Sequence, residues 1–257
     1  MHAPLTRRAM IAGLLAGAAT VVQGVAGAGP AHAEAAPTGT APGRRLLGRS
    51  TRGRPILVHR LGPANAATTV LVVGSIHGSE PAGIPIAQAL LTQTPPLGVR
   101  LIVVPTMNPD GDALHRRQNA RGVDLNRNFP GGVHAGRPGD VYYSGPKDAS
   151  EVETRLMRSL LEQVRPDALI VYHQHLDVVD HCGGDVAISR AYAADTGMRL
   201  THLARYPGSM ATWLHRLLPD CTILTVELPA AVGPALRRRH VTAVRRLSVR
   251  VAAAPGR

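Results

Sequence analysis

The chain has 257 residues, of which 44% are hydrophobic and 18% are charged. This composition is that of a globular protein, so a disordered chain is excluded, and the length allows one large domain or two small ones. Aromatic residues make up only 3%, too few for a stacking platform that binds single-stranded nucleic acid. Two cysteines exclude both a disulfide framework and a four-cysteine zinc site.

The formal net charge is +12, and Lys147 is the only lysine, so arginine supplies nearly all of the positive charge. Such an excess suits a polyanionic partner: nucleic acid, anionic lipid or an anionic cell wall. A solvated, arginine-rich surface with no partner gives the same net charge. Charge alone therefore does not choose between these alternatives.

Residues 1–33 have the pattern of an export signal. Arg7 and Arg8 precede an apolar run at 10–25, and Ala31-His32-Ala33 is a small-x-small cleavage site. The run is too short and too weakly apolar for a stable membrane span. We predict a twin-arginine signal at 1–33, a linker at 34–43 and a folded domain at 44–257. Ordinary secretory export and an uncleaved N-terminal anchor are the alternatives.

Export predicts a secreted, extracytoplasmic protein in the region of the cell wall. Cleavage removes Arg7 and Arg8 but no acidic residue, which leaves a net charge of +10. Outside the cytoplasm the environment is oxidising, so Cys182 and Cys221 either form a disulfide or remain free buried thiols.

The predicted elements of the folded domain begin with a hairpin at 46–61, whose turn is Thr51-Arg52-Gly53-Arg54. Short β-branched runs predict buried strands at 68–74, 99–104, 168–172 and 222–228. Helical spacing predicts helices at 81–91, 151–164 and 233–251, with Ser79 as the first N-cap and a Ser150–Glu153 capping box on the second. The alternation predicts a single α/β domain with a mixed, largely parallel sheet and helices on both faces.

Residues with metal-binding or acid–base side chains fall where these strands end, which is where α/β sheets bind ligands. His77 and Glu80 follow the strand at 68–74, and their spacing lets both side chains reach one metal ion. A His-x-x-Glu pair is a weak signal by itself. His173 ends the strand at 168–172, and Glu227 lies in the strand at 222–228, where a buried carboxylate needs a partner or a function.

Several motifs between residues 77 and 227 come in an order that resembles the zinc metallocarboxypeptidases of the carboxypeptidase A type. The resemblance is closest to their short bacterial branch, the murein peptide amidases, and it covers residues 44–255. It implies the fold of a zinc carboxypeptidase. The matching segments are His77-Gly78-Ser79-Glu80, Asn108-Pro109-Asp110-Gly111, Arg117-x-Asn119, the specific string Gly122-Val123-Asp124-Leu125-Asn126-Arg127-Asn128-Phe129-Pro130, Ser144-Gly145-Pro146, Ser150-Glu151-Val152-Glu153, His173 and Glu227.

The resemblance implies that His77, Glu80 and His173 are the ligands of one zinc ion. Two histidines and one carboxylate leave an open coordination position for water, as catalytic zinc sites do. Glu227 resembles the general base that takes a proton from the zinc-activated water and passes it to the leaving amine. Asp124 resembles the acid that orients His77 through its other ring nitrogen.

Three further residues resemble the family's substrate-binding groups. Arg117 resembles the arginine that polarises the scissile carbonyl and holds the developing oxyanion. Asn126 and Arg127 resemble the pair that binds the substrate carboxylate, for which a guanidinium fork is suited. Taken singly, a salt bridge on a helix surface for Arg117 and a turn for the string from Asp124 to Asn128 are plausible alternatives, but they explain the whole set poorly.

The side-chain pocket is less well defined. The family's mobile tyrosine corresponds to Tyr206, but Tyr206 lies closer to Ser209 than in the animal enzymes, so packing in a loop is the alternative to capping the substrate. The segment from Ser209 to Trp213 is expected to line the pocket and contains no acid, so a preference for Arg or Lys side chains is not predicted. Asp180 is expected to pair with a basic side chain, with contact to a polar substrate as the alternative.

The resulting hypothesis is an exported zinc metallocarboxypeptidase or amidase that hydrolyses an amide bond next to a free carboxylate. In the murein peptide amidase branch the substrate is a cell-wall peptide that contains diaminopimelate. The alternative is a deacylase of small N-acyl amino acids, similar to aspartoacylase and succinylglutamate desuccinylase. A non-catalytic wall- or polyanion-binding protein is less favoured because every ligand position is filled. We expect no specific nucleic-acid partner and no stable membrane span.

Overall fold

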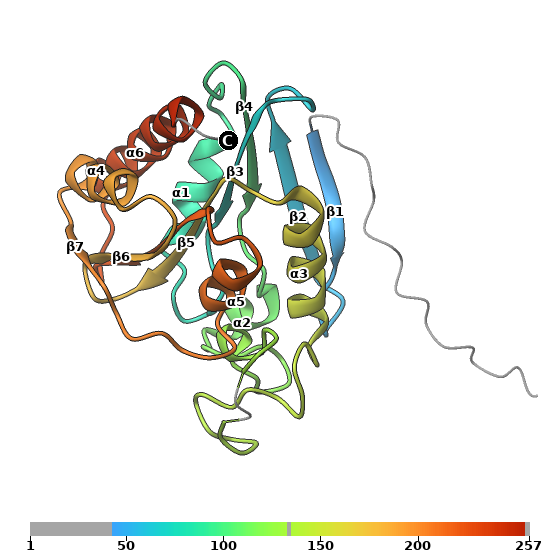
Figure 1. Cartoon of the computed structure of the whole chain (residues 1–257). Coiled ribbons are helices and arrows are strands. Elements are labelled where there is room, and N and C mark those ends of the chain that lie inside the picture. The colour runs from blue at the N-terminus through green and yellow to red at the C-terminus, as the bar shows by residue number, and fades with distance from the viewer. Residues whose placement is uncertain (1–42, 133–134, 255–257) are drawn as a thin grey trace, which may run out of the picture. The chain divides into compact units, whose positions relative to one another are not determined.

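Eight strands of the described residues form one sheet in the order β1-β2-β4-β3-β5-β8-β6-β7 (Figure 1). This computed structural model describes residues 43–132 and 135–254. The predicted export signal and all but the last residue of the predicted linker lie outside them. The strands are β1 Gly43–Arg49, β2 Pro55–Leu61, β3 Thr68–Val73, β4 Val99–Val104, β5 Ala168–Gln174, β6 Val178–Gly183, β7 Arg199–Thr201 and β8 Thr222–Leu228.

The sheet is mixed and mostly parallel at its centre, as predicted. Strands β3, β4, β5 and β8 run parallel to their neighbours within this group, whereas β2 on β4 and β6 on β8 are antiparallel. Strands β1 and β2 form the predicted hairpin. Because β3, β5 and β8 are parallel and adjacent, their carboxyl ends meet at one edge of the sheet.

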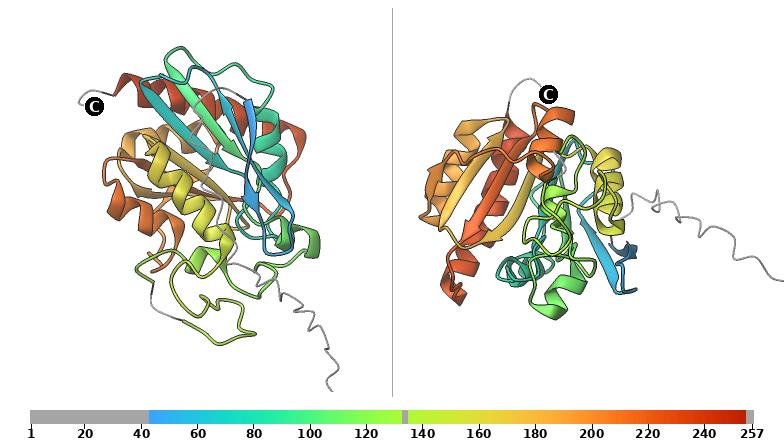
Figure 2. Two further views of the ribbon diagram at one scale, coloured as in Figure 1. Left: turned by 90° about the vertical axis from the view of Figure 1, so that its right-hand side faces the viewer. Right: turned by 90° about the horizontal axis from the view of Figure 1, so that it is seen from below.

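Helices cover both faces of the sheet (Figure 2). Successive strand residues point to opposite faces, so Leu71 and Val73 pack with α3 and α5, whereas Val70 and Val72 pack with α1, α4 and α6. Both layers are built mainly from aliphatic side chains, consistent with the low aromatic content. The helices are α1 Gly83–Leu90, α2 Pro109–Leu114, the short 3-10 helix η1 Leu125–Arg127, α3 Val152–Val164, α4 Val186–Thr196, α5 Met210–Leu217 and α6 Pro234–Ala253.

The predicted N-cap of the first helix is wrong. Helix α1 begins after Ala82, whose side chain makes no capping hydrogen bond. Ser79 lies three residues earlier, in a turn where the backbone N–H of Glu80 donates to the carbonyl of His77 at 2.9 Å. This turn brings two predicted metal ligands together, and it delays the start of the helix.

The predicted capping box on α3 is also absent. The helix begins after Glu151, and the Ser150 hydroxyl donates to the Glu151 carboxylate and accepts from the Asn128 side-chain amide. Glu153 is fully buried and accepts from the backbone N–H of Thr51 at 2.9 Å. These side chains tie α3 to the loop at 119–128 and to the β1–β2 turn, which is a long-range role that local spacing does not reveal.

Of the two alternatives for the cysteines, the structure shows thiols: Cys182 and Cys221 are both buried and form no disulfide with each other. In the part of the chain that the structure describes, no helix is both long and apolar enough to cross a bilayer.

Candidate active site

The loop after β3 places the first two predicted ligands at the sheet edge. The backbone hydrogen bond from Glu80 to His77 turns both side chains in the same direction, and both are at least nine-tenths buried. Gly78 lies against the backbone of Gly111, where a Cβ atom would come within 1.8 Å of the Gly111 carbonyl carbon. Only glycine permits this close approach, so the loop is held against the start of α2.

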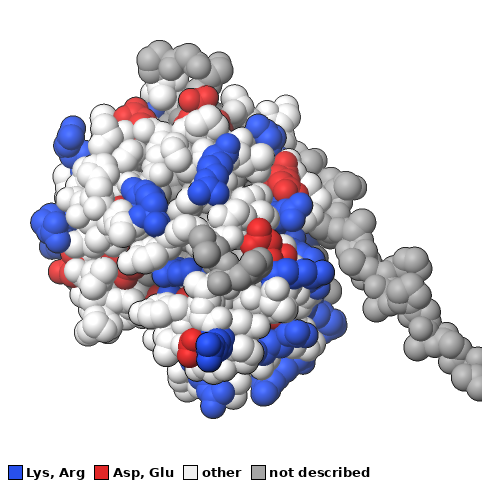
Figure 3. All heavy atoms as spheres, turned by 60° about the horizontal axis from the view of Figure 1, so that its bottom comes forward, with Lys and Arg blue, Asp and Glu red and all other residues white. Residues whose placement is uncertain are grey.

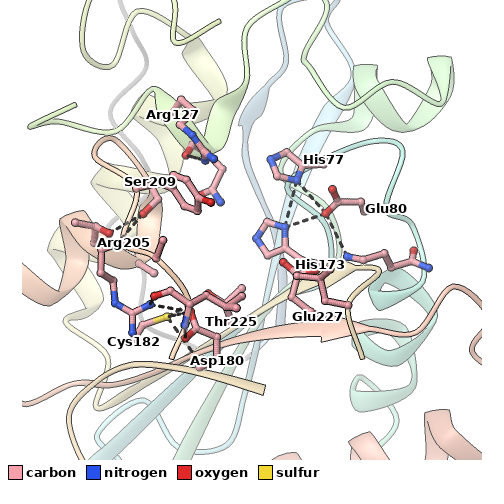
Figure 4. A pocket seen from close by; sticks show the side chains of 18 of the residues that line it. His77, Glu80, Arg127, His173, Asp180, Cys182, Arg205, Ser209, Thr225 and Glu227 are labelled. Carbon is pink, nitrogen blue, oxygen red and sulfur yellow. Dashed lines mark hydrogen bonds and ion pairs between the residues drawn. The ribbon is translucent and has the colours of Figure 1, made fainter. Parts of the chain in front are cut away.

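The side chains of His77, Glu80 and His173 converge on one point (Figure 4). Nδ1 of His77 and Nδ1 of His173 each lie 2.9 Å from Oε2 of Glu80 and 3.2 Å from each other. In a tetrahedral zinc site with metal–ligand bonds of about 2.0–2.1 Å, neighbouring ligand atoms lie about 3.3 Å apart. The three predicted ligands therefore fit a single zinc ion.

The hydrogen bonds of Asp124 determine which nitrogen of His77 is available. The fully buried Asp124 carboxylate lies 3.1 Å from Nε2 of His77, so this nitrogen carries the proton and Nδ1 presents a lone pair. That lone pair faces the Glu80 carboxylate, and the two groups repel each other unless a cation lies between them. Burial alone would lower the pKa of His77, but the carboxylates of Asp124 and Glu80 raise it, because this imidazole lies between two negatively charged groups.

The two carboxylates are held in their ionised forms. Burial alone would raise the pKa of Glu80, but the hydrogen bond from His173 holds it well below its usual range. The pKa of Asp124 is likewise lowered, against the effect of burial, by His77 and Arg117. An ionised Glu80 and a neutral His77 are the forms in which these side chains bind zinc.

Arg117 bridges the ligand and its supporting acid. Its Nε donates to Oδ2 of Asp124 at 2.9 Å, and its Nη1 donates to Oε1 of Glu80 at 3.0 Å. The explanation as an isolated surface salt bridge is wrong, because both partners belong to the cluster. Within the described residues, Nη2 of Arg117 has no partner, and this group lines the same cavity as the ligands.

Glu227 lies beside His173 across the β5–β8 pair, where the two residues are in register and face the same side of the sheet. Among the described residues its carboxylate makes no hydrogen bond and no ion pair, so no arginine contacts it directly. Burial, together with the charge of Glu80, raises the pKa of Glu227 in spite of the opposing effect of His173. An accessible carboxylate with a raised pKa suits a group that accepts and returns a proton.

The predicted carboxylate-binding residues lie opposite Glu227 in the same cavity of about 290 Å³. The side-chain oxygen of Asn126 accepts from the backbone N–H of Met210 at 3.0 Å, so its NH₂ group is left to donate to a ligand. The guanidinium of Arg127 stacks on the ring of Tyr206 at 4.3 Å, and that ring is half-exposed. This contact gives Tyr206 a place beside the substrate cavity.

All nine predicted site residues thus come together. Eight of them line the cavity, and Asp124 lies directly behind His77. Two neighbours were not predicted. The exposed ring of Tyr142 lies 5.1 Å from the guanidinium of Arg117 and 5.6 Å from that of Arg127. Arg205 forms a 2.8 Å ion pair with Asp180 inside the cavity, which confirms the expected basic partner of Asp180.

Comparison with known proteins identifies the family of the chain. Residues 44–182, which include His77, Glu80 and His173, match the zinc carboxypeptidase family. Murein peptide amidase A from Escherichia coli strain K12 is 30% identical over 222 residues, which are 80% of this chain and 89% of that protein. The crystal structure of murein-tripeptide amidase from Escherichia coli O157 has a TM-score of 0.66 and 27% identity, covering 84% of this chain and 94% of that one.

More distantly related peptidases share this fold. Carboxypeptidase A from Helicoverpa armigera superposes with a TM-score of 0.68 at 18% identity, and the match covers 84% of this chain and 70% of that one. The family match and the converging His-Glu-His cluster agree on one zinc ion as the cofactor. The chain belongs to the zinc carboxypeptidase family and is a zinc metallopeptidase.

Proposed function

We propose that this protein is exported and hydrolyses an amide bond next to a free carboxylate in cell-wall peptides. The observation that carries the proposal is the position of a carboxylate-binding pair, Asn126 and Arg127, in the same cavity as the zinc ligands and the unpaired Glu227. The similarity to murein peptide amidase A supports a cell-wall peptide as the substrate.

Zinc held by His77, Glu80 and His173 would supply a Lewis acid that polarises a carbonyl and lowers the pKa of water. The chain itself supplies the proton transfers: the Glu227 carboxylate accepts a proton from the attacking water and returns it to the nitrogen of the leaving amine. Because Glu227 has no partner among the described residues, no existing bond must break before it accepts the proton.

Arg117 stabilises charge that develops on the scissile carbonyl oxygen. Two of its nitrogens are fixed by Asp124 and Glu80, so its free Nη2 is held in place before the substrate arrives. A fixed donor of this kind lowers the barrier by about 2.7–4 kcal/mol, by analogy with other oxyanion-binding groups. Asp124 thus positions both His77 and Arg117.

Arg127 and the Asn126 amide hold the substrate carboxylate, which fixes the scissile bond relative to Glu227. Tyr206 stacks on Arg127 at the cavity mouth and orders this arginine in the absence of substrate. Preordering a flexible guanidinium reduces the entropy that binding would otherwise cost.

The surface charge supports an anionic partner. On the face shown in Figure 3, basic side chains are more widespread than acidic ones, and several adjoin each other in the lower part of the view. With the predicted export signal, this surface suits a protein that works against an anionic wall.

The proposal is tested with purified protein and two substrate classes. One is the tripeptide L-Ala-γ-D-Glu-diaminopimelate, and the other comprises N-acetylaspartate and N-succinylglutamate. We expect free diaminopimelate to be released, with activity abolished by a chelator and restored by zinc. Cleavage of the N-acyl amino acids with no cleavage of the tripeptide would contradict the proposal and favour a deacylase.

A further inference from the structure

A second charged group faces the cavity, away from the zinc ligands and the Asn126–Arg127 pair. It consists of Asp180 in β6 and Arg205 in the segment that follows β7 (Figure 4). The mechanism above uses neither residue. Asp180 has 5% of its side chain exposed, whereas Arg205 has 38% exposed, so the cation of the pair is the accessible partner.

The Asp180 carboxylate is already saturated by donors from the protein. One oxygen accepts from the backbone N–H of Leu203 at 2.8 Å. The other accepts from Arg205 at 2.8 Å and from the thiol of Cys182 at 3.1 Å. Burial and the charge of Asp180 raise the pKa of Cys182 to about 12, so this thiol keeps its proton and donates. Asp180 therefore serves as an anchor and has little capacity left for a ligand.

Only some of the hydrogen-bond donors of Arg205 have a partner in the protein. Its Nη1 donates to Asp180 and to the carbonyl of Leu203, and its Nη2 donates to the carbonyl of His181. Within the described residues, Nε–H and one Nη2–H have no partner, so two donors of the guanidinium remain available. A guanidinium with two free N–H groups can donate to both oxygens of a carboxylate.

The anchor also makes Arg205 a rigid recognition group. Fixing one edge to Asp180 and to two backbone carbonyls removes much of the rotamer freedom that an arginine loses when it binds a ligand. The lining of the cavity includes Thr212 and Thr225, and the segment Ser209–Trp213 contributes no acid to it. This part of the cavity is therefore suited to a polar, anionic group.

We propose that Arg205 determines specificity by binding a second carboxylate, carried at the end of the side chain of the leaving residue. This inference rests on the proposed function, in which Arg127 holds the first carboxylate of that residue. The substrate class is thus a peptide whose terminal residue carries an acidic group on its side chain. Asp180 is the positioning residue that holds Arg205.

The experiment compares two free amino acids that are products of the proposed reaction. Diaminopimelate differs from lysine by one extra carboxylate on the terminal side-chain carbon, so the pair isolates the proposed contact. Binding to the zinc-loaded protein is measured by calorimetry, for the wild type and for Arg205→Gln. We expect the wild type to bind diaminopimelate about 10- to 100-fold more tightly than lysine, as a charge-assisted hydrogen-bonded pair predicts. In Arg205→Gln this ratio falls to near one.

Two controls make the result interpretable. Arg246→Gln removes another ion-paired arginine, which contacts Asp195 from α6, and should keep the wild-type ratio. Arg205→Lys keeps the charge but loses the fork, and should restore only part of the ratio. An equal affinity of the wild type for both amino acids, or a ratio retained in Arg205→Gln, would overturn the inference. Tripeptide hydrolysis by the wild type is measured separately, and its absence would refute the proposed function.

Discussion

Replacing Glu227 by glutamine should abolish turnover and leave the fold and the zinc site intact. The carboxylate makes no hydrogen bond or ion pair among the described residues, so glutamine breaks no existing contact, and the two side chains have similar volumes. We therefore expect a melting temperature within about 2 °C of the wild type, since a change well below 1 kcal/mol shifts the melting temperature of a domain this size by no more than that.

The expected loss of activity follows from the proton that glutamine cannot accept. General base catalysis contributes roughly 10²–10⁴-fold, which corresponds to about 3–5 kcal/mol in the activation free energy. The assay measures kcat and KM on the cell-wall tripeptide, zinc content by mass spectrometry, and unfolding by calorimetry. The fall should appear in kcat, because the lost interaction acts during the reaction and not in substrate binding.

A matched control replaces an acid that has no part in the site. Glu162→Gln removes an exposed carboxylate of α3, which pairs with Arg158 on the surface. An exposed pair of this kind contributes at most about 1 kcal/mol, so activity and stability should stay close to the wild type. A Glu227→Gln variant with native stability, full zinc and near-native kcat would refute the role of Glu227 as the base.

Three further predictions test other parts of the site and fold. Asp124→Asn should weaken zinc binding about 10- to 100-fold, measured by competition with a chelator, because it removes the acceptor that orients His77; unchanged affinity would show that Asp124 does not orient it. Arg127→Ala should raise KM far more for substrates with a free carboxylate than for their amides; equal effects would remove Arg127 from the carboxylate site. Burial lowers the pKa of His240 from 6.5 to about 4, so the unfolded chain takes up a proton first, and about 3 kcal/mol of stability should be lost as the pH falls from 6.5 to 4. His240→Phe should remove that loss from denaturant unfolding curves, and an unchanged pH dependence would contradict this explanation.

The sequence was sufficient to predict the centre of the fold. The strands β3, β4, β5 and β8 are short runs rich in aliphatic and β-branched residues because most of their side chains on both faces are buried, and such runs can be recognised without a structure. Strand β6 was not predicted, because it contains Asp180, His181 and Cys182, whose polar groups have partners in other segments.

The site residues were predictable for a different reason. They lie in specific motifs at strand ends, and the chemistry of a metal site restricts which residue types can occupy them. What the sequence did not reveal were contacts between distant segments. Arg205 reaches Asp180 from 25 positions away, and Glu153 accepts from Thr51 across 102 positions. Such pairs depend on how the chain folds, so no local spacing predicts them.

We propose that this zinc site cleaves a cell-wall peptide next to a free carboxylate. The most direct measurement is mass spectrometry of peptidoglycan fragments digested with the purified protein, with and without a chelator. We expect release of the carboxyl-terminal residue by addition of one water across a single amide bond, only when zinc is present and Glu227 is intact. Unchanged fragments with the zinc-loaded wild type, or the same cleavage by Glu227→Gln, would contradict it.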